Sequence, residues 1–209
     1  MALVRVKSCG ICMTDYKAYS GERQNLHYPL ICGHEFSGVI EKVGNKLKFF
    51  QEGDEIIASP VSNCGICKNC REGLAQYCKN GAVIGGDGME KIINGAFAEY
   101  VLVPENSLYH KPKNISFDTA ALTEPLAGSY KGLIEYSHLK ISEDLVIIGA
   151  GSMGLLASMI AEKAGAANKS NCQAPIKNKT IENTVHKNST ALNIFIFQSS
   201  PIAAHFKLQ

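Results

Sequence analysis

The chain has 209 residues, of which 45% are hydrophobic and 19% charged, and its formal net charge is +2. These values are typical of a globular protein and give no reason to expect a nucleic-acid or membrane partner. No apolar run is long enough to span a bilayer, and the opening segment MALVRVKSCG lacks the apolar stretch of a secretory signal. The chain has eight cysteines but no secretory signal, and this combination favours the reducing cytoplasm, where clustered thiols usually bind metals.

The first 115 residues contain short apolar segments separated by glycine and proline. Val4 and Val6 alternate with Arg5 and Lys7, which predicts a half-buried strand. The segment YPLICGHEFSGVIEKVG predicts a strand pair, EGDEIIASP predicts one strand, and GAFAEYVLVPENSLYHKP predicts two. We therefore expect a small β-barrel or sandwich rather than a helical bundle.

A loop within this β-rich part contains Cys64, Cys67, Cys70 and Cys78. A disulfide knot, a zinc site, an iron–sulfur site and four unrelated thiols are the alternatives. A ferredoxin-like cluster has a shorter last gap and a proline after its last cysteine, and this loop has neither. Cys-x-x-Cys turns bring two thiolates to one ion, so the spacing favours zinc. Four thiolates fill a tetrahedral shell, which predicts a structural site.

From Ser116 the spacing of apolar residues becomes helical, with Ser116 as the N-cap and Pro125 as an interruption. Next, residues 145–148 predict a buried strand, and residues 153–163 predict a helix that ends at Gly165. Between them lies a G-x-G-x-x-G turn, whose glycines and helix N-terminus suit a pyrophosphate. A glycine-rich turn without a ligand is the alternative. The cofactor-binding candidates are Gly149, Gly151, Ser152, Met153 and Gly154.

The motifs CGICMTD, GHEFSGVIEKVG, the four-cysteine loop, EPLAGSYKGL and VIIGAGSMG occur in this order. Together they resemble the zinc-dependent medium-chain alcohol dehydrogenases, in the branch with sorbitol, threonine and sugar-alcohol dehydrogenases. The resemblance covers residues 1–166. It implies a GroES-like catalytic domain over 1–115 that lacks its first strands, the start of a Rossmann NAD-binding domain over 116–166, and a divergent tail over 167–209.

The resemblance also implies a catalytic zinc held by Cys12, His34 and a carboxylate, with Cys9 outside the ligand set. Glu35 and Glu124 both match carboxylates that serve the metal, and the direct ligand is left open between them. One thiolate, one imidazole and carboxylates with a position left for water or substrate form a catalytic zinc set. We therefore expect two zinc ions, one catalytic and one structural, together with NAD or NADP.

The implied reaction is hydride transfer from a secondary alcohol to the nicotinamide, with zinc as the Lewis acid. The alcohol could be a polyol, a sugar alcohol or a threonine-like compound. Thr14 matches a proton-relay hydroxyl, and Asp15 matches a carboxylate that orients a zinc-bound imidazole, although a turn threonine and a helix-capping aspartate are alternatives. Lys17 stands where many relatives have the next relay histidine, so the last proton acceptor is left open.

Two departures from the family pattern support a second hypothesis. The opening strands are absent, and the chain after residue 166 is rich in Asn, Lys and Ser, with LNIFIF as its only strand-like segment. About twenty positions after the glycines a ribose-binding acid is expected, but Lys169 lies there and Glu182 ends no apolar strand. The chain therefore looks truncated at both ends, and the alternative is a catalytically inactive zinc-binding remnant. The intact ligands disfavour a zinc-free quinone reductase. The expected partners are a small-molecule alcohol and a second copy of the chain.

Overall fold

A computed structural model describes residues 1–24, 26–86, 92–167, 169–172, 192–196 and 204–208. The chain divides into two compact units, Met1–Glu124 and Pro125–Gln209. The first unit therefore extends further than the boundary that we expected after residue 115. None of the described helices is both long and apolar enough to cross a membrane.

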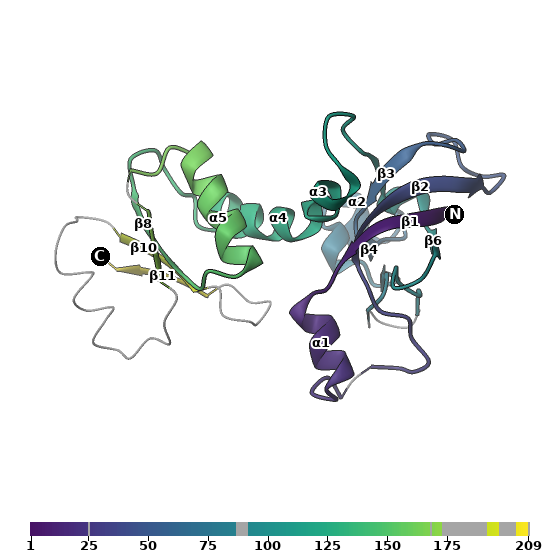
Figure 1. Cartoon of the computed structure of the whole chain (residues 1–209), viewed down its shortest axis with the longest axis horizontal. Helices are drawn as coiled ribbons and strands as arrows, with labels where there is room; N and C mark the ends of the chain where they lie inside the picture. Colours follow the sequence, from purple (N-terminus) through teal and green to yellow (C-terminus); the bar gives the residue numbers. More distant parts are fainter. Residues whose placement is uncertain (25, 87–91, 168, 173–191, 197–203, 209) are drawn as a thin grey trace. The chain divides into compact units, whose positions relative to one another are not determined.

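The first unit is built on a five-stranded sheet in the order β6-β1-β2-β3-β7, in which every neighbouring pair is antiparallel (Figure 1). A smaller two-stranded sheet pairs β4 with β5. The strands of this unit are β1 (Ala2–Gly10), β2 (Glu35–Val43), β3 (Glu55–Ala58), β4 (Val61–Ser62), β5 (Ala82–Val83), β6 (Tyr100–Val103) and β7 (Leu108–His110). Its helical segments are α1 (Met13–Tyr19), α2 (Lys68–Arg71), η1 (Ala75–Tyr77), η2 (Glu105–Ser107) and α3 (Phe117–Ala121), and α4 (Thr123–Tyr130) begins at its end.

The core of this unit lies on one face of the sheet. Val4 is fully buried and Val6 packs partly against the same cluster, whereas Arg5 is exposed and pairs with Glu41. The alternation predicted for the first strand is therefore confirmed. Phe36 on β2 is fully buried in the same cluster. Because Phe36 follows Glu35 directly, core packing fixes the start of β2, and with it the backbone that carries Glu35.

The predicted strand pair over YPLICGHEFSGVIEKVG was wrong, because only β2 forms there. The preceding segment is held by three backbone hydrogen bonds instead. The N–H groups of Gly95, Ala96 and Phe97 donate to the carbonyls of Ile31, Gly33 and Cys32. Gly33 has a φ of 94°, a left-handed conformation that interrupts an extended strand. The chain therefore turns immediately before His34.

The helix α3 begins as predicted, since the Ser116 hydroxyl accepts a hydrogen bond from the Thr119 N–H at 3.1 Å. The Ser37 hydroxyl, fully buried on β2, donates to the Phe117 carbonyl at 2.7 Å and holds α3 against the sheet. The helical path breaks between α3 and α4, so Pro125 lies in the first turn of α4 rather than interrupting a helix. A proline there removes no helical hydrogen bond.

The second unit has a four-stranded sheet in the order β11-β10-β8-β9, and α5 lies against it (Figure 1). Both β9 and β10 pair parallel with β8, and β11 pairs antiparallel with β10. Its elements are η3, a π-helix (Lys131–Tyr136), β8 (Asp144–Ile148), α5 (Ser152–Lys163), β9 (Lys169–Cys172), β10 (Leu192–Ile196) and β11 (Ala204–Leu208).

The predicted strand and helix around the glycine turn are confirmed as β8 and α5, and the strand predicted from LNIFIF is confirmed as β10. The expectation that LNIFIF is the only strand of the tail was wrong, because β9 and β11 also form. The sequence of β9 is KSNC, without an apolar residue before its cysteine, so its periodicity gives no strand signal. Its pairing with β8 makes it a strand. Glu182 lies outside the described residues.

Candidate active site and structural metal site

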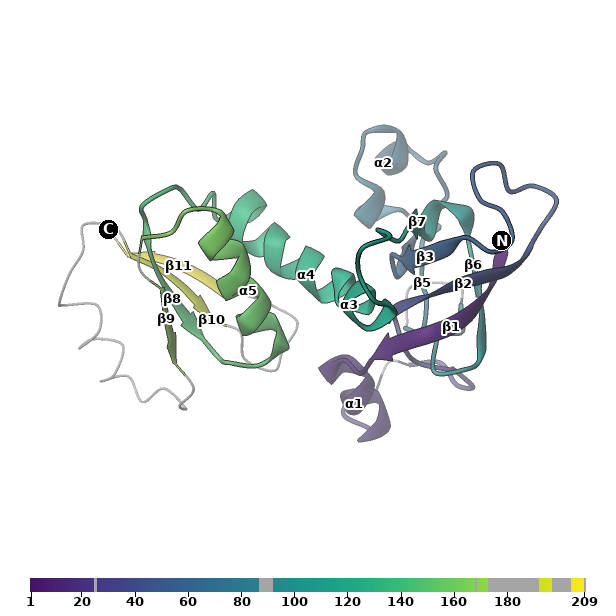
Figure 2. The ribbon, with the colours of Figure 1, turned by 45° about the horizontal axis from the view of Figure 1, so that its top comes forward.

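The structure brings Cys12, His34 and Glu35 together at the end of the antiparallel pair formed by β1 and β2. Strand β1 leads directly into α1, with Cys12 as the N-cap residue of that helix (Figure 2). Gly10 and Glu35 form the last residue pair of the β1–β2 ladder. One sulfur, one imidazole nitrogen and one carboxylate oxygen from the three side chains lie within 4.8 Å of one another. This donor set fits a zinc ion with a coordination position to spare.

Asp15 connects the backbone on both sides of this group. Its carboxylate accepts the Cys12 N–H at 2.9 Å and the Gly33 N–H at 3.2 Å, and it lies 3.5 Å from Nδ1 of His34. Burial alone would raise the pKa of Asp15, but the hydrogen bonds from these three residues outweigh it and hold the pKa below its usual value. Asp15 is therefore an ionised, buried acceptor that contacts the imidazole and also takes part in the capping box of α1.

The contact with Asp15 occupies Nδ1 of His34 and leaves Nε2 as the nitrogen that faces Thr14. The Thr14 hydroxyl lies 3.5 Å from Nε2. Burial alone would lower the pKa of His34, whereas its hydrogen bonds and charge interactions with Asp15 and Cys12 raise it to about 10. In the metal-free protein His34 is thus protonated at neutral pH, and a metal ion must displace that proton to bind.

The two candidate carboxylates differ in position. Glu35 belongs to the group of three, and burial raises its pKa. Glu124 in α4 is not part of that group. Burial raises the pKa of Glu124 as well, and the charges of His34 and Glu35 are close enough to act on it. The geometry therefore favours Glu35 as the third ligand atom, with Glu124 as a neighbouring carboxyl.

Cys9 lies close to these residues in sequence but is not in the group of three. Its thiol faces the Gly10 carbonyl at 3.6 Å. Burial, followed by the charge of Asp15, raises the pKa of Cys9 to about 12. Cys9 is therefore a protonated thiol that lies outside the group of three donors.

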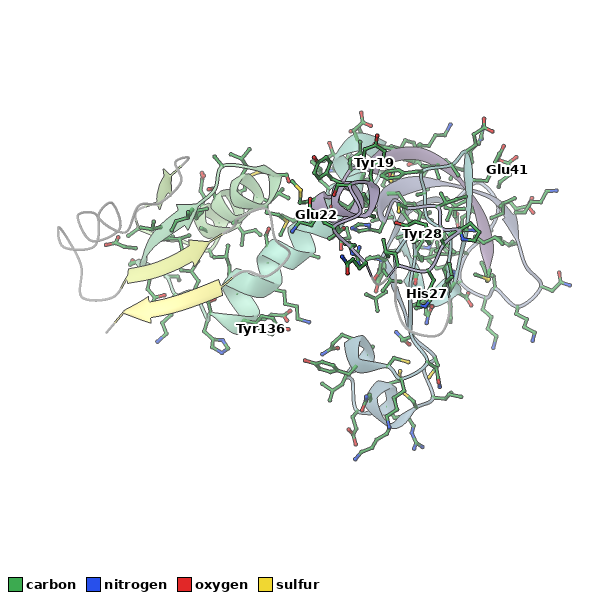
Figure 3. All side chains as sticks on the ribbon, turned by 90° about the horizontal axis from the view of Figure 1, so that it is seen from below. Tyr19, Glu22, His27, Tyr28, Glu41 and Tyr136 are labelled. Atoms are coloured by element: carbon green, nitrogen blue, oxygen red, sulfur yellow. The ribbon has the colours of Figure 1, made fainter. Side chains whose placement is uncertain are left out.

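The four cysteines of the loop around α2 form the second group of donors. Their sulfur atoms all lie within 4.8 Å of one another, and Sγ of Cys67 is 3.5 Å from Sγ of Cys70 and 3.9 Å from Sγ of Cys78. These separations are too long for disulfides. In a tetrahedral zinc site with Zn–S bonds near 2.3 Å, neighbouring sulfurs lie about 3.8 Å apart. Cys64, Cys67, Cys70 and Cys78 therefore fit a closed zinc shell, on a segment that projects from the unit (Figure 3).

Backbone N–H groups point at the sulfurs of this group and lower the pKa of two of its thiols. The N–H groups of Ile66 and Cys67 lower the pKa of Cys64 to about 6. Those of Cys70 and Lys79 lower the pKa of Cys67. Burial, together with hydrogen bonds from the neighbouring thiols, raises the pKa of Cys70 to about 12 in the metal-free loop. Cys64 and Cys67 therefore lose their protons more readily and can bind zinc as thiolates, whereas zinc must displace the proton of Cys70.

The turn between β8 and α5 in the second unit has the features that a dinucleotide requires. Gly149 has a φ of 106°. A methyl group on Gly154 would overlap the Gly149 carbonyl oxygen, so the helix can approach the strand only with glycine there. At Gly151 a methyl group would meet no atom within 4 Å, which leaves the backbone at the start of α5 open to a ligand. Ser152 and Met153 form the first turn of α5.

Two features of the site were not predicted from the sequence. These are Gly10, whose importance depends on its cross-strand partner in the β1–β2 register, and the Gly33 N–H as a donor to Asp15. A glycine two positions before Cys12 and the glycine of GHE were the available signals, but neither indicates a partner by itself.

Replacement of Asp15 by asparagine is expected to destabilise the chelator-treated protein by roughly 2–4 kcal/mol near pH 6, because a buried charge-assisted pair is lost. The lowered pKa of Asp15 means that its contribution is present above the ordinary pKa of 3.8 and is lost as the pH falls below it. The raised pKa of His34 means that its contribution is complete below 6.5 and is lost as the pH rises towards about 10.

The stability difference between wild type and Asp15→Asn should therefore be largest between pH 3.8 and pH 6.5, the ordinary pKa values of the two groups. Urea unfolding at a series of pH values measures it. The exposed Asp118, in the first turn of α3, provides the matched control Asp118→Asn. A difference that does not change with pH would show that Asp15 stabilises the fold without pairing with His34.

Comparison with known proteins agrees with this geometry. The family model for the alcohol dehydrogenase GroES-like domain matches residues 1–113. L-threonine 3-dehydrogenase of Marinomonas sp. (strain MWYL1) is 34% identical over 79% of this chain and 48% of its own length. D-arabitol-phosphate dehydrogenase of Enterococcus avium is 34% identical over 78% of this chain and 46% of its own.

Among solved structures, a protein of Sinorhizobium meliloti 1021, assigned as a zinc-binding dehydrogenase and bound to NADP, is similar with a TM-score of 0.73. It is 31% identical, and the match covers 91% of this chain and 53% of that one. The chain thus spans about half the length of the relatives that it matches. From the domain match and the β-rich fold, the chain belongs to the alcohol dehydrogenase family with a GroES-like domain, followed by an α/β unit of Rossmann type.

Proposed function

We propose that this chain is part of a zinc-dependent oxidoreductase that transfers a hydride from a secondary alcohol to NAD or NADP. The observation that carries the proposal is the convergence of Cys12, His34 and Glu35, with Asp15 ionised behind the imidazole. A closed four-sulfur site accompanies this open three-donor site in the same unit. Two donor sets of such different composition suit one catalytic and one structural zinc ion.

Each residue of the open site has a defined task in this proposal. Cys12, His34 and Glu35 would hold the catalytic zinc, which when bound supplies Lewis-acid polarisation of the alcohol oxygen. Asp15 accepts from Nδ1 of His34 and so keeps Nε2 directed at the metal position. Thr14, whose hydroxyl lies beside Nε2, would accept the proton of the alcohol and pass it on.

Glu124 and Lys17 have supporting tasks. Glu124 lies outside the three-donor group, and burial is the main cause of its raised pKa. It would therefore bind a water molecule or substrate hydroxyl next to the metal rather than the metal itself. Lys17 lies one turn after Thr14 on α1 and, with solvent, is a candidate for the final proton acceptor.

The glycine turn would bind the nicotinamide cofactor through its pyrophosphate. Gly149, Gly151 and Gly154 allow the backbone to approach, and the N–H groups of Ser152 and Met153 begin α5. The Ser129 hydroxyl donates to the Met153 carbonyl at 3.3 Å and holds this first turn. The similar structure that contains NADP supports a nicotinamide ligand for this type of chain.

The substrate class follows from the relatives and is a proposal for this chain. One relative is a threonine dehydrogenase and another is an arabitol-phosphate dehydrogenase. Threonine carries a secondary hydroxyl, and an arabitol phosphate offers secondary hydroxyls as well. We therefore propose a polyol, sugar alcohol or threonine-like compound as the substrate, and a homo-oligomer in the cytoplasm as the working form.

Three measurements on the purified chain test the proposal. Metal analysis should give about two zinc ions per chain. Titration should detect NAD or NADP binding, and steady-state assays with threonine, arabitol phosphate and sorbitol should show cofactor reduction with one of them. Two zinc ions without cofactor binding or turnover would instead support the zinc-binding remnant. No zinc in the folded chain would overturn the assignment of both metal sites.

A further inference from the structure

Gly10 is the last residue of β1, and its backbone conformation does not explain why it is a glycine. It has no left-handed φ and lies in an extended strand, where glycine usually weakens the structure. A glycine inside a strand often marks a place where another group approaches closely. The surroundings of Gly10 identify that group.

Glu35 is the cross-strand partner of Gly10 in the β1–β2 ladder. A methyl group placed on Gly10 would overlap Oε2 of Glu35, and it would lie 3.2 Å from Cβ and 3.4 Å from Cδ of the same side chain. These are the three nearest atoms to that methyl position, and they all belong to Glu35. The carboxylate therefore lies over the bare backbone of Gly10, in the space that any other residue would fill.

This space matters because the same carboxylate is one of the three donors of the open site. Glu35 is only 9% exposed, so a displaced carboxylate could not simply turn outward into water. Phe36, the next residue on β2, is fully buried in the core, and this packing prevents the strand from moving to compensate.

We propose that Gly10 is a positioning residue that seats the Glu35 carboxylate in the open metal site, because only the absence of a side chain at position 10 leaves room for it. This inference rests on the proposed function, in which Glu35 is a zinc ligand. Gly10 does not touch the metal position and acts only through Glu35. Its role differs from that of Gly38 on β2, where a methyl group would instead meet the Arg5 carbonyl and Val4.

The test is zinc affinity of the open site in Gly10→Ala, measured by competition with a chelator. The expected result is binding weakened roughly 10- to 100-fold, the range found when groups that orient metal ligands are removed. Cobalt(II) in place of zinc gives a second readout, since its visible spectrum reports the number and type of ligands. The thiolate band from Cys12 should persist while the bands that depend on coordination by the carboxylate change.

Gly132 provides a matched control, because a methyl group there would meet no atom within 4 Å and its φ is not left-handed. Gly132→Ala should bind zinc and cobalt as the wild type does. The background Glu35→Ala shows whether Gly10 acts through the carboxylate. Gly10→Ala should change zinc affinity by no more than about twofold in that background, where Oε2 and Cδ of residue 35 are gone and only Cβ remains.

The outcomes separate this inference from the proposed function. A wild-type chain that holds zinc only at the four cysteines would overturn the proposed function. A wild type with two zinc ions, together with an unaltered Gly10→Ala, would overturn the role of Gly10 alone. An equal loss with and without Glu35 would do the same. If Gly10→Ala does not fold, the double variant Gly10→Ala/Glu35→Ala should fold, and its failure would show that position 10 requires glycine for another reason.

Discussion

Replacement of His34 by alanine is expected to reduce the zinc content from about two ions per chain to about one and to lower the rate of the proposed alcohol oxidation by about 1000-fold or more. The imidazole is one of three donors, and two remaining donors hold zinc weakly. The loss also leaves the buried Asp15 carboxylate without its partner at 3.5 Å. Metal analysis and steady-state kinetics measure the two effects separately.

His27 is the matched control for this variant. It is exposed, lies outside both donor groups, and is visible on the surface of the first unit in Figure 3. His27→Ala should retain both zinc ions and full turnover. A His34→Ala protein that keeps two zinc ions would show that the imidazole is not a ligand, whatever its activity.

Replacement of Cys70 by alanine is expected to remove the other zinc ion and to destabilise the chain by several kcal/mol, since binding energy at a structural zinc site is folding energy. A loss of about 3 kcal/mol lowers the Tm of a chain of this size by roughly 10 °C. The chemistry should persist in the fraction that remains folded, because Cys70 belongs to the closed group and not to the group of Cys12 and His34.

Hydrogen exchange over residues 64–78, zinc analysis and thermal unfolding measure this prediction. Exchange should accelerate in that loop first, because the backbone N–H groups of Cys64 and Cys67 point at sulfurs of the zinc site in the wild type. Cys32→Ala is the control, because Cys32 lies outside both donor groups. An unchanged zinc content in Cys70→Ala would mean that the four-sulfur group does not bind zinc as a unit.

The sequence predicted the local elements well where apolar spacing was strong. The strand at Val4 and Val6, the helix cap at Ser116 and the strand–turn–helix around Gly149 all form as expected. It was wrong where pairing rather than composition decides the structure. Strand β9, KSNC, forms by parallel pairing with β8, and the predicted strand before His34 is replaced by a segment bound to residues 95–97.

The sequence by itself determined the chemistry of the donors. Cysteine spacing in the loop predicted four thiols for one ion, and the family resemblance of the motifs around Cys12 and His34 predicted a thiol and an imidazole. Short-range spacing is sufficient here because a Cys-x-x-Cys turn fixes the distance between its own sulfurs.

Only the tertiary structure distinguished the positions of the two carboxylates. Glu35 and Glu124 both follow recognisable motifs, but the β1–β2 register places Glu35 opposite Gly10 and beside Cys12, whereas α4 keeps Glu124 outside the donor group. The structure also showed that Asp15 joins Cys12, His34 and Gly33. The contacts of Asp15 with His34 and Gly33 link segments about twenty positions apart, so they depend on how strands pair and where the chain turns, which no local pattern specifies.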